Sequence, residues 1–402
     1  MIKFLVIEQD LRVSGTSQGI ISRSFLAKLR MAYPESIIDV LYLKTYESED
    51  QLDLLPVNSI TSHIIKLKPP FHVKWINRIS WRLFNYSMYD RFVHQSFAKY
   101  ISQVDIDKYD HVFVRSAGLN HETILGTKDL PVLKKAIVNF HDPYPLYWYV
   151  GSKSELSGVE LSRLQNMQNV VAQAQKCMSS ANCMSKDMQF LYGSKKIFHS
   201  LPHQYDESVF DLSDVKDIYP KTKKVTISYH GAIQFGRNLD IVLDSYKELV
   251  EANKTFRDNT EFILRLKSSE FNRLKEKYQS IENIKILKSI NFSNAAHEQK
   301  YIADINIILE NGPLYCNILV GKAPFLAFTK KPILSISPLR SELRDIIKDG
   351  QFIAHMNDQQ DIKQKLKALI ENRLTSNEAV YPFGDYFSDE NFKKSIDAIL
   401  SA

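Results

Sequence analysis

Short apolar runs and longer amphipathic stretches alternate along most of the chain. The apolar runs are rich in Ile, Val and Leu, which is typical of strands buried on both faces of a parallel sheet. The stretches between them carry apolar residues at helical spacing, as in Ile20–Ala32, Glu155–Gln175 and Leu239–Ala252. This alternation predicts an α/β fold. The predicted strands are Ile2–Ile7, Ile37–Leu43, His63–Leu67, Asp110–Arg115, Lys135–Phe140, Lys176–Ser180, Lys196–Ser200, Lys224–Tyr229, Glu261–Leu266, Ile284–Leu287, Ile305–Leu309 and Pro332–Ile336.

One stretch, Pro202–Pro220, interrupts the alternation, since it has no clean period and is rich in acids. A chain of 402 residues is also too long for a single core. We therefore predict a Rossmann-like domain at 1–205, a linker at 206–222 and a second Rossmann-like domain at 223–380. A final helix within 381–402 is expected to pack back toward the first domain. Two doubly wound domains of this kind are expected to face a central cleft.

The segment Asp304–Ile336 reads as strand, loop, helix and strand, with Lys322 near the start of the helix. Asn311, Gly312 and Pro313 form the loop. Open α/β sheets bind ligands beyond the C-terminal ends of their strands, where helix N-termini attract phosphate. We therefore expect Lys322 to meet the diphosphate of a nucleotide. The alternative is a lysine on a solvated surface.

A similar junction follows the predicted strand Lys224–Tyr229. Gly231 and Gly236 lie in the loop, and Arg237 and Asn238 stand at the start of the next helix. Glycine backbone and a guanidinium together form a plausible phosphate seat. The alternative is that Arg237 is an ordinary surface residue.

Polar residues also follow two predicted strands of the first half. Arg115 and Ser116 follow one strand, and His141, Asp142 and Tyr144 follow the next. Strand tips are where α/β enzymes place chemistry, and histidine exchanges a proton near neutral pH. These side chains are expected to project into the cleft. The alternative for His141 is a residue that only caps a turn before two prolines.

The loop after the first predicted strand contains Gly15 and Gly19. Glycine there lets the backbone approach a ligand, but the spacing is not that of the GxGxxG dinucleotide fingerprint. A flexible strand–helix connection explains the loop equally well.

The segment Lys66–Lys99 combines many cations with many aromatic residues and a single acid, Asp90. A helix of this kind lies in an anionic membrane interface or holds an anionic acceptor. Stacking on single-stranded nucleic acid and simple packing of the aromatics in the core are the alternatives. The residues are Lys66, Lys68, Lys74, Arg78, Arg82, Arg91 and Lys99, interleaved with Trp75, Trp81, Phe84, Tyr86, Tyr89, Phe92 and Phe97.

Composition narrows the function classes. The net charge of +6 favours anionic partners. Three cysteines without a CxxC pair argue against a disulfide framework or a zinc site. No apolar window approaches the ~20 residues of a membrane helix, and no P-loop, HExxH or GxSxG motif is present. The one DxD, Asp105 with Asp107, lies in a polar turn, and we expect no metal there.

Several short motifs occur in a fixed order along the chain. They are Gly15-Thr16-Ser17-Gln18-Gly19, His141-Asp142-Pro143, Pro202-His203 with Asp206, Gly231 with Arg237-Asn238, and Gly321-Lys322 with Pro324 and Lys331–Leu334. With them, the chain resembles the retaining glycosyltransferases of the GT-B fold, especially family-4-like sugar transferases of bacterial polysaccharide synthesis. One departure is that the family's E-x7-E pair would fall on Asn317 and Phe325, which are not acids.

The resemblance implies sugar transfer from a nucleoside diphosphate sugar to a hydroxyl of a glycan or lipid-linked acceptor, with retention and without a metal or other cofactor. Arg237 and Lys322 would stabilise the leaving diphosphate, and Glu342 or Glu310 would replace the missing acid at the donor ribose. The implied catalytic residues are Arg237, Lys322, His141 and Asp142; donor-binding residues also include Gly15, Gly19, Gly231, Asn238, Lys267, Glu310, Gly321, Ser341 and Glu342; acceptor-side residues are Arg115, Ser116 and Tyr144.

The expected location is the cytoplasm, with peripheral contact at the anionic inner face of the cell membrane and no nucleic-acid partner. Three other functions stay open. They are a sugar-nucleotide-binding homologue without turnover, a nucleic-acid-binding protein that uses segment 66–99, and a nucleotide-sugar epimerase of similar fold.

Overall fold

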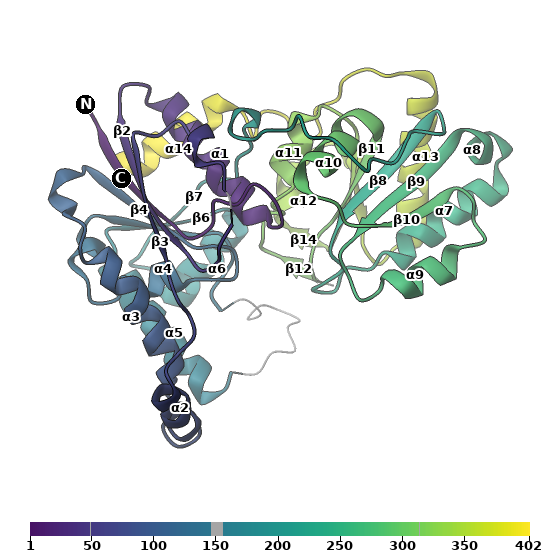
Figure 1. Ribbon diagram of the computed structural model, residues 1–402. Helices are drawn as coiled ribbons and strands as arrows, with labels where there is room; N and C mark the ends of the chain where they lie inside the picture. The colour runs from purple at the N-terminus through teal and green to yellow at the C-terminus, as the bar shows by residue number, and fades with distance from the viewer. Residues whose placement is uncertain (49, 146–155, 313) are drawn as a thin grey trace. The chain divides into compact units, whose positions relative to one another are not determined.

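The strands and helices form two parallel sheets, one in each of two units of the chain (Figure 1). The computed structural model describes residues 1–48, 50–145, 156–312 and 314–402. The first unit is Met1–Val209 with Asp389–Ala402, and the second is Phe210–Ser388. The predicted fold class of two Rossmann-like α/β domains is confirmed.

The sheet of the first unit has the strand order β3-β2-β1-β4-β5-β6-β7, and all its neighbouring strands are parallel. The chain winds outward in both directions from β1 and β4, so the topological switch point lies between these two strands. The predicted third strand, His63–Leu67, forms earlier in the chain, at Ser59–Ile64. The strands are β1 Lys3–Glu8, β2 Ile37–Lys44, β3 Ser59–Ile64, β4 His111–Arg115, β5 Ala136–Phe140, β6 Lys176–Ser179 and β7 Phe198–Ser200.

Two helices from opposite ends of the chain pack together on the first sheet. The ring of Phe25 on α1 meets Phe113 on β4 at 5.3 Å and Phe392 on α14 at 6.2 Å between centroids. Lys28 also pairs with Asp389 at 2.6 Å. The predicted start of α5, Glu155, lies outside the described residues. The helices of this unit are α1 Ser17–Ala32, α2 Phe71–Phe84, α3 Met88–Ile101, α4 Glu122–Leu125, α5 Gly158–Gln173, α6 Asn182–Tyr192 and α14 Asp389–Ser401.

The sheet of the second unit has the order β10-β9-β8-β11-β13-β15, with its switch point between β8 and β11. A short pair, β12 with β14, lies outside this sheet. The strands are β8 Val225–Gly231, β9 Thr260–Leu266, β10 Ile284–Lys288, β11 Ile305–Leu309, β12 Tyr315–Cys316, β13 Ile333–Ser337, β14 Arg340–Ser341 and β15 Ile353–His355. The helices are α7 Asp240–Ala252, α8 Lys254–Asn259, α9 Phe271–Tyr278, α10 Phe292–His297, α11 Ala323–Phe328, α12 Glu342–Ile346 and α13 Gln359–Thr375.

The predicted linker is attached along its length to one unit or the other. Residues 206–209 belong to the first unit. Beyond them, the backbone N–H of Lys216 donates to Asn294 at 2.8 Å, and that of Tyr219 donates to Glu298 at 2.7 Å. Hydrogen bonds to side chains therefore fix residues in this stretch that have no strand or helix of their own.

The basic aromatic segment forms two helices where the sequence predicted one. Asn85 adopts a left-handed conformation (φ 51°) that ends α2, and Ser87 caps α3 by accepting from the N–H of Asp90. Core packing was one expectation for the aromatics of this segment. It is wrong for α2, where the side chains of Trp75, Trp81 and Phe84 are 57%, 52% and 72% exposed.

Candidate functional site

The predicted donor residues Gly231, Arg237 and Lys322 meet at the switch point of the second sheet. Gly231 ends β8, and Arg237 closes the loop that follows. Lys322 precedes α11, the helix after the neighbouring strand β11. The C-terminal ends of two adjacent parallel strands therefore bring together residues far apart in sequence.

Lys322 lies directly against the end of β8. Its Nζ donates to the carbonyl of His230 and stands 4.7 Å from the centre of the Tyr229 ring. A Cβ at position 231 would lie 2.9 Å from this Nζ and 3.1 Å from Oη of Tyr229. Glycine at 231 is therefore required for the close approach of the lysine.

Arg237 reaches the same loop from its other end. Its Nη1 donates to the carbonyl of Ala232 at 3.2 Å, and Oη of Tyr229 donates to the same carbonyl at 3.0 Å. Nε of Arg237 is buried without a hydrogen-bond partner. The guanidinium thus keeps donor capacity that the protein does not use.

Lys322 and Arg237 are close enough to repel one another. Among the residues that the structure describes, neither Lys322 nor Arg237 forms an ion pair. Burial, followed by repulsion from Arg237, lowers the pKa of Lys322 to about 7. Two cations held together and partly desolvated are costly unless an anion compensates them. This arrangement is suited to binding a phosphate or diphosphate.

The loops around the pair are joined by a hydrogen bond from the N–H of Gly312 to the carbonyl of Phe235, at 2.9 Å. A Cβ on Gly236 (φ +79°) would lie 2.8 Å from the Gly312 carbonyl, so this contact needs glycine. Pro313, part of the predicted loop, lies outside the described residues.

Three other predicted donor residues surround the pair. Oδ1 of Asn238 accepts from the N–H of Asp240, the first residue of α7, at 2.9 Å. Lys267 follows β9 with an exposed side chain, and its N–H donates to the carbonyl of Gly231 at 3.3 Å. Gly321 directly precedes Lys322, in the turn before α11.

Glu310, Ser341 and Glu342 form a separate buried cluster at the start of α12. Burial raises the pKa of Glu310 to about 7, and its Oε1 accepts from the N–H of Leu343 at 3.5 Å. Ser341 caps α12, and Tyr386 donates to Glu342 at 3.2 Å. Both carboxylates are fully buried. The predicted ribose ligands are therefore covered by other protein groups.

The positions of the missing acid pair are both buried. Phe325 lies in the core, with its ring 6.0 Å from that of Phe292. Asn317 is 6% exposed. An acid at position 325 would lose this aromatic contact and require a partner for its charge.

In the first unit, Arg115 does not project from its strand as predicted, because it is buried in an ion pair. Its Nη1 donates to Glu8 at 2.5 Å, and the guanidinium stacks 3.8 Å from the centre of the Phe25 ring. Burial raises the pKa of Glu8 to about 7, because the cost of desolvating its charge exceeds the attraction of Arg115. Arg115 is thus a positioning group for its neighbours.

One neighbour is His141, which is also buried. Nη2 of Arg115 donates to its Nε2 at 2.8 Å, and the side-chain amide of Gln18 contacts its Nδ1. Since Nε2 accepts, the proton lies on Nδ1, and Gln18 must present its amide oxygen. Burial and Arg115 hold the pKa of His141 well below its ordinary value. The backbone N–H of His141 donates to Oγ of the buried Ser116 at 3.0 Å.

Asp142 stays partly exposed, and burial raises its pKa to about 6. Nε2 of His121 lies 3.1 Å from the Asp142 carbonyl oxygen, and the His121 ring meets that of Tyr144 edge-on at 5.0 Å. Gly19 serves packing, since a Cβ there would lie 2.2 Å from the carbonyl of Arg12. Gly15 (φ +89°) forms an open turn, in which a Cβ would have nothing within 4 Å.

The sequence reasoning assigned no role to Glu8, His121 or Tyr229, and it named Gln18 only as part of the loop motif. Glu8 carried a signal, because a carboxylate that ends a buried strand needs a cationic partner. Tyr229 carried none, because it occupies an ordinary position in an apolar strand.

Metal-binding and membrane-spanning features are absent from the described residues. No group of three or more His, Cys, Asp or Glu suited to a metal ion occurs in the described part of the chain. No helix in residues 1–48, 50–145, 156–312 and 314–402 is long and apolar enough to cross a membrane.

Comparison with known proteins gives fold neighbours but no sequence relatives. No protein-family model matches the chain, and no curated protein matches its sequence. The catalytic domain of starch synthase IV from Arabidopsis thaliana, bound to ADP and acarbose, matches with a TM-score of 0.63 and 11% identity over 100% of both chains.

Two other solved structures are similar over nearly the full length. Sucrose-phosphate synthase from Thermosynechococcus elongatus matches with a TM-score of 0.62 and 10% identity, over 100% of this chain and 95% of that chain. UDP-GlcNAc 2-epimerase from Neisseria meningitidis, bound to UDP-GlcNAc, matches with a TM-score of 0.56 and 13% identity over 100% of both chains. At such low identity these similarities show a shared GT-B fold.

Proposed function

We propose that the protein is a glycosyltransferase that takes a sugar from a nucleoside diphosphate sugar and transfers it to a hydroxyl acceptor in polysaccharide or glycoconjugate synthesis, with retention. The observation that carries this proposal is the pair Arg237 and Lys322 at the switch point of the second sheet, two partly buried cations that form no ion pair with any described residue. The fold neighbours with ADP and with UDP-GlcNAc bound support it.

The main chemical difficulty is the charge that develops on the leaving diphosphate. Arg237 and Lys322 are held in place before substrate arrives, so they stabilise this charge without reorganisation. Preorganised electrostatic stabilisation of this kind often contributes more to catalysis than any other effect. In a retaining reaction of this kind the leaving phosphate itself accepts the proton of the acceptor hydroxyl.

Asp142 is the proposed contact to sugar or acceptor in the first unit, because the residue follows β5 and is only half-buried. His141 contributes by position. Its ring is fixed between Arg115 and Gln18, which fixes the chain direction at Asp142.

We also propose that α2 holds the enzyme peripherally at the anionic inner face of the cell membrane. Lys74, Arg78 and Arg82 recur every fourth residue and so form one line along the helix. Trp75 and Phe84 are exposed on the same helix. Cations beside exposed aromatics are the features of a helix that lies in an anionic interface.

The proposed reaction needs no metal, because the two cations supply the positive charge. Asp105 and Asp107 are engaged locally, by Lys108 at 3.5 Å and Lys135 at 3.3 Å. Activity is expected to persist in EDTA. Loss on chelation with rescue by Mn²⁺ would contradict this.

A panel of UDP-, ADP- and GDP-sugars, read by thermal shift, tests donor binding, since a specific ligand raises stability by mass action. Lys322→Ala should abolish the shift, and Lys254→Ala, an exposed lysine of the same unit, should keep it. The absence of any shift in the wild type would overturn the proposal.

Incubation of the donor alone separates the rival functions. The epimerase neighbour bound to UDP-GlcNAc makes epimerisation the second candidate. Conversion of the donor sugar without acceptor would identify an epimerase. Binding without conversion, hydrolysis or transfer would identify a non-catalytic homologue.

A further inference from the structure

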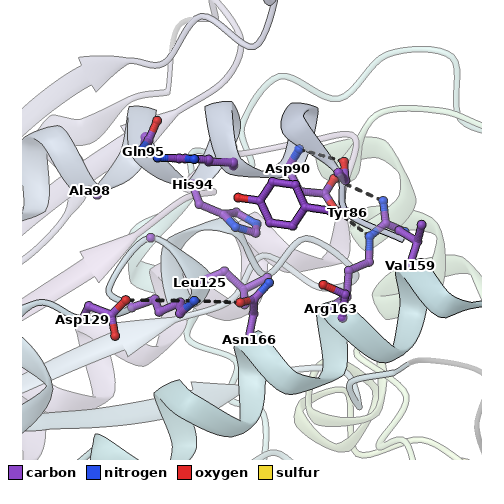
Figure 2. A pocket seen from close by; sticks show the side chains of 15 residues that line it. Tyr86, Asp90, His94, Gln95, Ala98, Leu125, Asp129, Val159, Arg163 and Asn166 are labelled. Atoms are coloured by element: carbon purple, nitrogen blue, oxygen red, sulfur yellow. Dashed lines mark hydrogen bonds and ion pairs between the residues drawn. The ribbon is translucent and has the colours of Figure 1, made fainter. Parts of the chain in front are cut away.

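A polar groove lies between α3 and α5 in the first unit (Figure 2). Its cavity measures ≈ 360 Å³, which is within the size range of small-molecule sites. The lining residues on α3 and α5 recur every three to four positions, so each helix contributes one face to the groove. The end of α4 contributes Leu125 and Gly126. The polar lining residues are Tyr86, Ser87, Asp90, Arg91, His94 and Gln95 from the α3 side, Lys128 and Asp129 after α4, and Ser162, Arg163 and Asn166 from α5.

Two bridges cross this groove. At one end the guanidinium of Arg163 binds Asp90 through two hydrogen bonds, of 2.6 and 3.1 Å. At the other end Nζ of Lys128 donates to Oδ1 of Asn166 at 2.8 Å (Figure 2). His94 lies between the bridges, and burial lowers its pKa to about 4. At neutral pH it is therefore an uncharged imidazole with one donor and one acceptor.

The groove continues toward the strand ends. A second cavity of ≈ 290 Å³ shares Asp90, His94 and Arg163 with the first and extends to His121 and Tyr144. His121 in turn binds the carbonyl of Asp142, the proposed contact to the reacting groups. A ligand along the groove would thus reach from the outer helices to the strand ends.

The charges of the groove largely cancel. Asp90 neutralises Arg163, and Asp129 lies 4.0 Å from Lys128, which leaves Arg91 at the exposed rim. This differs from the unpaired cations of the second unit, which suit phosphate. The remaining groups are amides, hydroxyls, a neutral imidazole and one phenol, with apolar lining from Ala98, Leu125 and Val159. Such a set both donates and accepts, as sugar hydroxyls do.

We propose that this groove binds the glycan part of the acceptor, as an uncharged, hydroxyl-rich sugar chain; the proposal rests on the glycosyltransferase function proposed above. Asp90 and Arg163 present charge-assisted hydrogen bonds to neighbouring hydroxyls, and Asn166 fixes the far end of the sugar. Tyr86 in the groove and Tyr89 in the adjoining second cavity offer aromatic rings to the apolar side of a pyranose.

The test is ligand-observed NMR with saturation transfer to a panel of uncharged sugars: the methyl glycosides of glucose, galactose and N-acetylglucosamine, with maltose and cellobiose. Glucuronate and glucose 1-phosphate form the anionic arm. We expect transfer to at least one uncharged sugar. Asn166→Leu should weaken its binding roughly fivefold, and Arg163→Leu roughly tenfold or more, as expected for a neutral and a charged hydrogen bond.

Gln165→Leu is the matched control, because Gln165 is exposed on α5 beside Asn166 and does not line the groove. It should bind as the wild type does. All variants should keep the thermal shift with nucleotide sugars, which shows that they are folded and separates this proposal from the donor site. The proposal would be overturned if no uncharged sugar showed saturation transfer, or if only the anionic sugars bound. It would also be overturned if Asn166→Leu and Arg163→Leu both bound the sugar as tightly as the wild type.

Discussion

Buried cations stand at the strand ends of both sheets, but in opposite electrostatic states. In the first unit Arg115 has Glu8 as a partner and uses its remaining contacts on His141 and Phe25. In the second unit Lys322 and Arg237 repel one another, and neither forms an ion pair with an acid in the part of the chain that the structure describes. The fold itself balances the first site, while the second is the site for which we propose an anion as the balancing charge. Position at a strand end therefore does not by itself distinguish a structural cation from a binding cation.

Breaking the balanced pair should produce the largest effect. Arg115→Met leaves Glu8 buried without its partner, which should destabilise the first unit by about 3–5 kcal/mol. Urea unfolding of the full chain measures it. Arg273→Met is the control, because Arg273 forms a half-exposed pair with Asp240 at 2.7 Å and should cost at most ~1 kcal/mol.

The destabilisation caused by Arg115→Met should grow with pH. Burial raises the folded-state pKa of Glu8 to about 7 from an ordinary 4.5, so its contribution to stability is lost as pH rises through 7. Without Arg115 the folded pKa rises further, and the loss continues above pH 7. The difference between variant and wild type should therefore be larger at pH 9 than at pH 5. A difference independent of pH would contradict the role given to Glu8.

Removing one unpaired cation should instead affect turnover. Arg237→Ala or Lys322→Ala is expected to lower turnover by roughly 10²–10³, the effect of losing one preorganised donor. Stability should stay equal or rise slightly, because a buried unpaired charge is removed. Lys254→Ala should match the wild type in both respects. Unchanged turnover in both alanine variants, with the fold intact, would remove the assignment.

The contrast between the units also shows what the sequence could predict. Strand and helix order followed from periodicity, and so did the meeting of Arg237 with Lys322, because both follow strands in a predictable sheet. The pairing of Arg115 with Glu8 did not follow, since it depends on which strands are neighbours. The groove between α3 and α5 was missed for the same reason. Its polar residues, such as Arg163 and Asn166, look like an ordinary solvated helix face.

The exposed helix α2 provides the next prediction. Each juxtamembrane cation contributes on the order of 1 kcal/mol toward an anionic surface, so changing Lys74, Arg78 and Arg82 to Glu should reduce partitioning by roughly a hundredfold or more. Flotation with phosphatidylcholine vesicles, with and without phosphatidylserine, measures it. Raised salt should also release the wild type.

The matched control changes Lys254, Lys275 and Lys367 to Glu, three exposed lysines of the second unit with the same total charge. It should still float with anionic vesicles. Equal recovery with both lipids, or no effect of the α2 variant, would remove the membrane proposal. Salt-sensitive binding to a single-stranded oligonucleotide in place of vesicles would favour the nucleic-acid alternative.

The smallest expected effect tests whether the unpaired cations are held ready for an anion. Burial and Arg237 lower the pKa of Lys322 to about 7, so near pH 8 most of the free protein carries a neutral lysine. A bound diphosphate restores the charge and raises this pKa. Binding of a nucleotide sugar should then take up roughly one proton at pH 8 and almost none at pH 6, and affinity should fall about tenfold between them.

Calorimetry in two buffers of different ionisation heat measures this uptake, and a nucleotide sugar is the right probe because its diphosphate exchanges no proton near neutral pH. Glu310, whose pKa is also raised to about 7, is the competing source of a proton. Lys322→Arg separates the two, because arginine stays charged throughout this range. It should bind the nucleotide without proton uptake. Proton uptake that persists in Lys322→Arg would place the titrating group at Glu310. The second unit would then resemble the first, because in both a buried acid would respond to a charge nearby.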